Sequence, residues 1–159
     1  MQTEAHIEVF LRAMGEGDVT TAIGQLADTV ELRSPIFVDP FVGKARVGEV
    51  LEALMQIVES FQPRLLLRNG ADLIAMIRIS HDGQEIDGFD HIHLDESGRI
   101  GGMTVAWRPL PAVVALQQVL APRLGVTAQR LVPKDHEYKA EPWDHSVPRR
   151  QRSCQNERW

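Results

Sequence analysis

Cysteine is nearly absent from this sequence of 159 residues, which carries only Cys154. A single thiol excludes a disulfide within these residues and a cysteine-ligated metal cluster. Long apolar runs are also missing, since none approaches the ~18 residues that cross a bilayer. The first ten residues hold acids where a secretory signal needs a basic stretch followed by an apolar one. We therefore expect a cytoplasmic protein that neither enters a membrane nor is secreted.

The sequence also lacks an excess of positive charge. The chain has 17 Lys and Arg against 22 Asp and Glu, for a net charge of -5. This charge gives no basic field to attract phosphate backbones, so nucleic acid is not an expected partner. A Gly-rich phosphate loop, a Gly-x-Ser-x-Gly turn and a His-Glu-x-x-His helix are absent too. Nucleotide cofactors, serine hydrolysis and zincin chemistry therefore lack support, and we expect no cofactor.

The apolar content is sufficient for one globular core. Apolar residues make up 43% of the chain, and domains commonly run ~100 to 150 residues. After Gly125 the composition changes to prolines and the basic run 149–152, which predicts a domain at 1–125 and a polar Pro/Arg-containing tail at 126–159. Trp143 and Trp159 keep open an ordered wrap of this tail, because large aromatics favour a docking site.

Helical spacing of apolar residues occurs in four segments. Ile7, Phe10, Leu11 and Met14 predict a first helix over 4–14. Asp18 is a typical N-cap, and it predicts a second short helix that runs through Leu26. The strongest helical pattern lies over 44–61, and a last helix is expected over 109–125.

Alternating and β-branched segments separate these helices. A first strand is expected at 30–34, followed by an aromatic, proline-bearing loop at 36–43 of the kind that lines a pocket. Four more strands are predicted in succession, at 64–68, 72–80, 85–94 and 100–108. Asn-Gly, Asp-Gly and Glu-Ser-Gly turns connect these strands as hairpins. This order predicts an α+β fold in which a curved antiparallel sheet wraps around the long helix and forms a cone-shaped pocket.

Two stretches carry a resemblance to a known family. Gly88-Phe-Asp-His-Ile-His-Leu-Asp-Glu-Ser-Gly-Arg-Ile100, continued from Met103 to Trp107, resembles the last two strands of ketosteroid isomerases and SnoaL-like polyketide cyclases. The opening, from Phe10 through Gly17-Asp18 to Ser34-Pro35, resembles the first helices and strand of the same proteins. The resemblance covers residues 4–108 and implies the nuclear transport factor 2-like, cystatin-like fold.

The resemblance implies roles for three positions. The family's oxyanion-stabilising aspartic acid falls on Asp90, its oxyanion tyrosine on Phe10 and its general-base aspartate on Ser34. Only the first of these chemical groups is kept. A serine alone cannot take and return a proton near neutral pH, so the family's isomerase mechanism is not expected in unchanged form.

Asp90 is the candidate catalytic acid. It alternates with Ile92 and Leu94 along one strand, so we expect a carboxyl group among apolar neighbours. Desolvation raises the pKa of such a group and favours a neutral acid that donates a hydrogen bond to an oxyanion. Asp39, in the aromatic loop, is the candidate replacement base; the alternative is an exposed turn acid beside Pro40.

Apolar side chains of the expected pocket are the candidate substrate-binding groups, although ordinary core packing explains many of them equally well. The predicted substrate-binding residues are Phe10, Ser34, Phe37, Met55, Ile77, Ile92, Met103, Val105 and Trp107.

The outer face of the sheet carries two further features. His91 and His93 share one strand face, and His81 could approach them from the neighbouring strand, but this spacing alone is a weak metal signal and no metal site is predicted. Arg78 lies in an otherwise apolar strand beside Ile74 and Met76. We expect a homodimer through the backs of the sheets, with Arg78 paired across it.

Two functions remain open at this stage. The first is a cofactor-independent isomerase, cyclase or hydrolase that acts on a small apolar or polycyclic molecule, with Asp90 as acid. The second is a noncatalytic ligand-binding or dimerisation module that has lost the family's base. A second titratable group within reach of a ligand held by Asp90 distinguishes them.

Overall fold

The computed structural model describes residues 5–129. The predicted tail, apart from its first four residues, therefore lies outside the described residues. The elements in chain order are α1 (His6–Glu16), α2 (Val19–Ile23), β1 (Leu26–Arg33), β2 (Phe41–Val42), α3 (Lys44–Met55), β3 (Ser60–Asn69), β4 (Asp72–His81), β5 (Gln84–Leu94), β6 (Ile100–Arg108) and α4 (Leu110–Arg123).

The six strands form one sheet in the order β2-β1-β6-β5-β4-β3. The last four strands make an antiparallel meander, as predicted. However, β1 pairs in parallel with β6, so the sheet is mixed: the predicted antiparallel pairing holds for every other ladder and not for this one. After β1 the chain passes through β2, α3 and the first three strands of the meander. It then returns as β6, which lies beside β1 and runs in the same direction.

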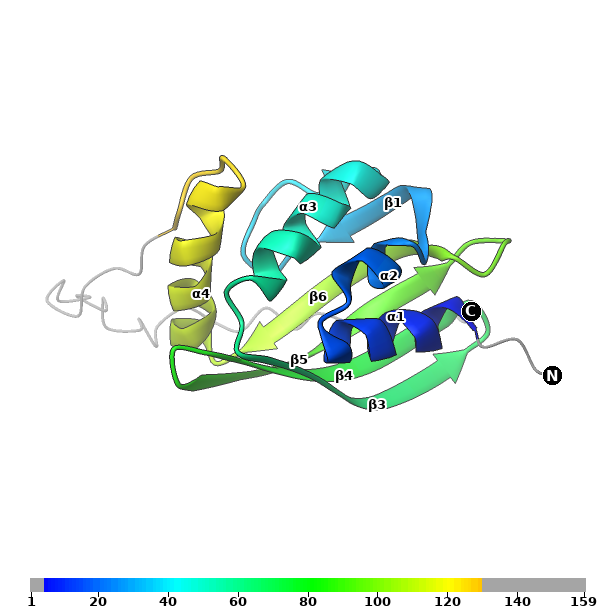
Figure 1. The fold of residues 1–159 in the computed structure, drawn as a ribbon, viewed down its shortest axis with the longest axis horizontal. Helices are drawn as coiled ribbons and strands as arrows, with labels where there is room; N and C mark the ends of the chain where they lie inside the picture. The colour runs from blue at the N-terminus through cyan, green and yellow to red at the C-terminus, as the bar shows by residue number, and fades with distance from the viewer. Residues whose placement is uncertain (1–4, 130–159) are drawn as a thin grey trace, which may run out of the picture.

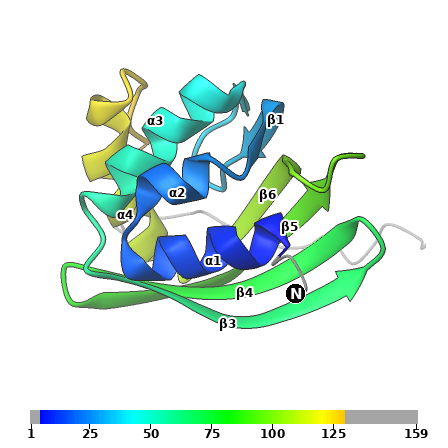
Figure 2. The ribbon, with the colours of Figure 1, turned by 45° about the vertical axis from the view of Figure 1, so that its right-hand side comes forward.

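The sheet bends around the helices, as Figure 1 and Figure 2 show. In both views α1, α2 and α3 lie on the same side of the sheet, and α4 stands at one end next to α3. Helix α3 packs against β1, whereas α1 packs against β3. The α+β fold with a curved sheet and a long helix is therefore confirmed.

Two predicted helices extend too far along the chain, and the strands after them, predicted at 30–34 and 64–68, begin earlier, at Leu26 and Ser60. The long helix ends at Met55 rather than at Phe61, which belongs to β3 and pairs with Ile79. Phe61 is buried in the core, so its apolar character, which extended the helical spacing, serves the strand instead. Likewise Leu26 is the first residue of β1 and not the end of the second helix, because Gly24 caps α2.

The predicted hairpin turns are confirmed in the meander. Asp82 and Gly83 both have positive φ, at 49° and 67°, which matches the turn type that suits the twist of two antiparallel strands. Gly70 has a φ of 63° in the preceding turn. These turns fix the register of β4 on β3 and of β5 on β4, in which Asp90 lies opposite Ala75.

The hydrophobic core fills the space between the sheet and the helices. Its residues come from the inward faces of α1, α3, α4 and the strands, and they include Ile7, Val47, Ile77, Ile92 and Leu116. Within the described residues, none of the helices has the length and apolar character needed to cross a membrane.

Candidate functional site

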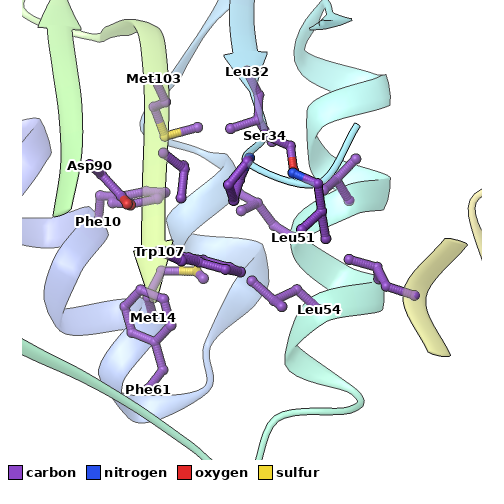
Figure 3. Close-up of a pocket in the computed structure, with 15 residues that line it drawn as sticks. Phe10, Met14, Leu32, Ser34, Leu51, Leu54, Phe61, Asp90, Met103 and Trp107 are labelled. Carbon is purple, nitrogen blue, oxygen red and sulfur yellow. The ribbon is translucent and has the colours of Figure 1, made fainter. Parts of the chain in front are cut away.

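A pocket opens on the concave side of the sheet, where α1, α3, α4 and the end of β1 meet β5 and β6. Asp90 lies beside Phe10 on one side of the pocket, and Ser34 and Leu51 lie on the other (Figure 3). Fifteen residues line it: Phe10, Met14, Leu32, Ser34, Pro35, Ile36, Val50, Leu51, Leu54, Phe61, Asp90, Met103, Val105, Trp107 and Leu120. The lining is thus almost entirely apolar.

Asp90 is the ionisable side chain of this pocket. The residue is only 7% exposed, and its Oδ1 atom has no hydrogen-bond partner among the described residues. Burial raises the pKa of Asp90 from its ordinary value of 3.8 to about 7, while the nearby Trp107 side chain acts in the opposite direction. At neutral pH the carboxyl group therefore exists in both protonation states and can give or take a proton.

Gly88 makes room for Trp107 beside Asp90. The two residues are register partners on β5 and β6. A Cβ atom at Gly88 would lie 2.1 Å from the carbonyl oxygen of Ala106 and 2.4 Å from Cδ1 of Trp107. Any side chain at position 88 would therefore push the indole away from its present place.

The pocket holds few other polar groups. Ser34, directly after β1, accepts a hydrogen bond at its Oγ from the backbone N–H of Ile36, at 3.3 Å. The indole N–H of Trp107 is the remaining polar side-chain group among the lining residues. No second titratable side chain lines the pocket within the described residues.

The structure brings six of the predicted site residues together. They are Phe10, Ser34, Asp90, Met103, Val105 and Trp107. Three of them, Met103, Val105 and Trp107, alternate along β6 and therefore share its inward face. Their assignment as substrate-binding residues stays a prediction.

Five predicted residues lie elsewhere. Ile77 and Ile92 are fully packed in the core, and Met55 packs against it at the end of α3. Asp39 and Phe37 line a separate hollow, formed by the loop before β2 and residues 125–129.

The loop geometry explains the position of Asp39. Ile36 and Phe41 are buried and anchor the two ends of the loop, so residues 38–40 between them face outward. The ring of Phe37 meets that of Phe41 edge to face, at 5.5 Å between centroids. The structure therefore does not support Asp39 as the base of the Asp90 pocket.

Several lining residues were not predicted from the sequence. Met14 lies one helical turn after Phe10, so the pocket face of α1 was readable from the pattern. Leu51 and Leu54 belong to the apolar stripe of α3 that was assigned to the core. Leu120 comes from α4, which the family resemblance does not cover, and no sequence signal pointed to it.

The histidine pair lies on the outer face of the sheet, away from the pocket. His91 Nε2 and His93 Nδ1 are 2.9 Å and 3.0 Å from the same oxygen of Asp72. His81, at the other end of β4, bonds the carbonyl of Ile57 and does not approach them. The described part of the chain contains no group of three His, Cys, Asp or Glu side chains arranged to hold a metal.

Arg78 also finds its partner within the chain. Its Nε donates to Oδ1 of Asp87 on the neighbouring strand, at 2.7 Å, and Glu85 lies 3.5 Å from its Nη1. The bond from Arg78 lowers the pKa of Asp87. The charge of Arg78 is therefore already balanced within the chain, and its pairing across a dimer stays a prediction.

Comparisons with known proteins give a fold but no sequence family. No family model matches the chain, and no curated protein matches it. Among solved structures, a bacterial protein with a cystatin-like fold from Silicibacter pomeroyi is 25% identical, with a TM-score of 0.70 over 74% of this chain and 84% of that one. A steroid delta-isomerase from Pseudomonas aeruginosa is 24% identical, with a TM-score of 0.68 over 79% of this chain and 96% of that one.

A third structure is more distant. The epoxide hydrolase/cyclase-like enzyme SalBIII, associated with pyran ring formation in the polyether salinomycin, is 18% identical. It has a TM-score of 0.58 over 67% of this chain and 90% of that one. At these identities the likeness concerns the fold. The chain thus has the nuclear transport factor 2-like, cystatin-like fold, which confirms the superfamily resemblance drawn from its sequence.

Proposed function

We propose that this protein is a cofactor-independent enzyme of the isomerase or cyclase type, in which Asp90 moves a proton on a small apolar substrate that carries a carbonyl or epoxide oxygen. The observation that supports this is the environment of Asp90. A buried carboxyl group with a pKa of about 7 and an unpartnered oxygen faces an apolar pocket. A strongly perturbed acid in a cleft is typical of a functional site.

Isomerisation and cyclisation both suit a single acid–base group, because in each reaction the group regains its starting protonation state within one turnover. With a ketone, the carboxylate takes a proton from the carbon next to the carbonyl, and the C–H electron pair forms the enolate. The carboxylic acid then returns a proton to carbon. With a hydroxy-epoxide, the acid protonates the epoxide oxygen as its C–O bond breaks, and the attacking hydroxyl gives its proton back to Asp90. Two of the fold neighbours are named for such chemistry, as an isomerase and a hydrolase/cyclase-like enzyme.

A noncatalytic binding module is the second candidate. The observation that favours it is that no second titratable side chain lines the pocket within the described residues. In such a module Asp90 donates a hydrogen bond to the ligand oxygen and transfers nothing. The residue that binds is the same in both cases, so only a chemical readout separates them.

The experiment combines a titration with two simple reactions. Carboxyl-carbon NMR, with the Asp90 signal assigned from the Asp90→Asn variant, measures the pKa of Asp90 with and without cyclopentanone. We expect a midpoint near 7 that moves when the ketone is added. Deuterium uptake by cyclopentanone in D2O measures proton transfer at carbon. Ring opening of cyclopentene oxide by water, which yields the diol, measures proton transfer at oxygen, and both rates should exceed those with Asp90→Asn by at least tenfold.

The outcomes separate the two candidates. A shifted midpoint together with reaction rates equal to those of Asp90→Asn would replace the enzyme by the binding module. A normal midpoint that no ligand moves would remove Asp90 from any site. Circular dichroism of the variant shows whether the fold is kept, since asparagine has the shape of the neutral acid.

A further inference from the structure

Helix α4 supplies a pocket wall that comes from outside the family resemblance. It contacts α3, β5 and β6 at one end of the sheet (Figure 1). Leu120, in its last turns, is almost fully buried and lines the pocket. The opening that the curved sheet and α3 leave at this end is therefore narrowed by a leucine side chain.

Specific bonds hold α4 at its present distance from α3. Arg46, in the first turn of α3, donates to the carbonyl of Leu124 at 2.8 Å. Arg123 donates to the side chain of Gln56, after the other end of α3, at 3.1 Å. Residues at both ends of α3 are thus bonded to the C-terminal end of α4. These bonds hold the turn of α4 that carries Leu120.

A buried glutamine adds a second restraint on the same turn. Gln117 is almost inaccessible, and its Oε1 accepts from the backbone N–H of Gln129 at 2.9 Å. Its amide group also lies 3.4 Å from the carbonyl of Thr127. The chain after α4 is therefore folded back against the helix.

The space that remains in the pocket is small. Its volume is about 50 Å³. A dry engineered cavity that binds benzene measures roughly 150 Å³, and pockets for drug-sized ligands are roughly 300 to 1,000 Å³. A single-ring ketone, about the size of benzene, therefore needs a few lining side chains to move, and a fused-ring ligand would have to displace many more. The polycyclic substrates expected from the sequence do not suit this pocket.

We propose that Leu120 on α4 sets the upper size limit of the ligand, so that the site takes small acyclic or single-ring ketones and epoxides rather than fused-ring compounds. The proposal rests on the proposed function in one respect, because it places the ligand oxygen at Asp90. The size limit itself depends on the pocket wall that Leu120 forms, and not on whether Asp90 transfers a proton.

The test is a series of ketones with one oxygen and a growing apolar body: acetone, cyclopentanone, 2-decalone and a tetracyclic 3-ketosteroid. Dissociation constants come from the chemical shift of the Asp90 carboxyl carbon, which reports occupancy without turnover. For the unmodified protein we expect saturable binding of cyclopentanone and at least tenfold weaker binding of 2-decalone. In Leu120→Ala the ratio of the two constants should shift at least tenfold in favour of 2-decalone, and in Leu120→Phe the binding of cyclopentanone should weaken at least tenfold.

Leu116→Ala is the matched control. Leu116 is a fully buried leucine on the same helix that does not line the pocket, so its loss disturbs α4 without enlarging the site. In Leu116→Ala the ratio of the dissociation constants of cyclopentanone and 2-decalone should equal that of the unmodified protein. If Leu120→Ala does not fold by circular dichroism, Leu120→Val takes its place, with a shift of at least threefold expected.

Two results would overturn the size limit. One is tight binding of 2-decalone or the steroid by the unmodified protein, and the other is the same ratio in the Leu120 and Leu116 variants. Failure of the proposed function looks different, because deuterium uptake and epoxide opening would then be absent while the Leu120-dependent ratio stays.

Discussion

The side chain of Asp90 shows how one residue type takes opposite roles in different surroundings. Asp72 is exposed and Asp95 is half-buried, and bonds from His93 and His91 and from Ser97 lower their respective pKa values. Asp90 has almost no polar partner, and burial raises its pKa to about 7. The sequence predicted this direction from the apolar alternation around Asp90.

A stability measurement at the residue scale follows from this shift. Since the folded pKa of Asp90 is raised, the native state binds more protons than the unfolded chain between pH 3.8 and about pH 7. Stability contributed by neutral Asp90 is therefore present at low pH and is lost as pH rises through this window. A shift of this size corresponds to about 4 kcal/mol.

The Asp90→Asn variant isolates this contribution. We expect its free energy of unfolding, measured by urea denaturation, to exceed that of the unmodified protein by an amount that grows to about 4 kcal/mol between pH 4 and pH 7. Other carboxyl groups titrate in both proteins and cancel in the difference. A difference that does not change with pH would mean that Asp90 ionises normally.

At the scale of the elements, the pairing of β5 with β6 builds the polar end of the pocket. Gly88 faces Trp107 across this ladder, and the close approach leaves no room for a Cβ atom. A Cβ atom added at Gly102, on β6, would lie 3.8 Å from Cβ of His93, which is an ordinary van der Waals distance. Substitution of both glycines by alanine therefore separates the effect of steric crowding at Gly88 from the effect of replacing a glycine in a strand.

We expect Gly88→Ala to lower the free energy of unfolding by about 1 to 3 kcal/mol, the usual cost of overpacking. Gly102→Ala should change it by less than about 0.5 kcal/mol. Urea denaturation at one pH measures both. Equal effects of the two substitutions would show that the backbone at Ala106 and the indole of Trp107 both make room for a Cβ atom at little cost.

The same scale shows which elements sequence patterns can and cannot locate. The hairpin turns and the ends of β6 were predicted correctly, because Asp-Gly and Asn-Gly turns and strict alternation are local signals. The end of α3 was not, since Phe61 continues the helical spacing and yet pairs in β3. A burial pattern alone does not distinguish an inward strand residue from one more turn of helix.

For the whole molecule, the outer face of the sheet is the remaining surface to explain. Leu65, Leu67, Met76 and Phe89 are exposed on neighbouring strands of this face, and α1, α2 and α3 lie on the other side (Figure 2). Arg78 and Asp87 pair beside this apolar surface and neutralise each other. We propose that a second copy of the chain covers it, because a face with balanced charge meets itself without repulsion and two-fold dimers are the commonest assembly.

Sedimentation equilibrium tests this association. We expect the unmodified protein at tens of micromolar to have twice the chain mass of 17.8 kDa. Phe89→Glu places a charge on the apolar surface, next to Met76, and should give monomers. Val38→Glu is the control, since Val38 is 91% exposed on the loop before β2 and away from this face. A monomeric unmodified protein would contradict the dimer.

The sequence by itself determined the order of elements, the hairpin turns, the inward face of β6 and the buried acid, because alternation, turn chemistry and helical spacing act between near neighbours. Only the tertiary structure decided the parallel pairing of β1 with β6, the outward position of Asp39 and the wall that Leu120 adds. Each of these joins segments that are distant along the chain. The space left between such segments depends on how all of them pack together, and a local pattern carries no information about it.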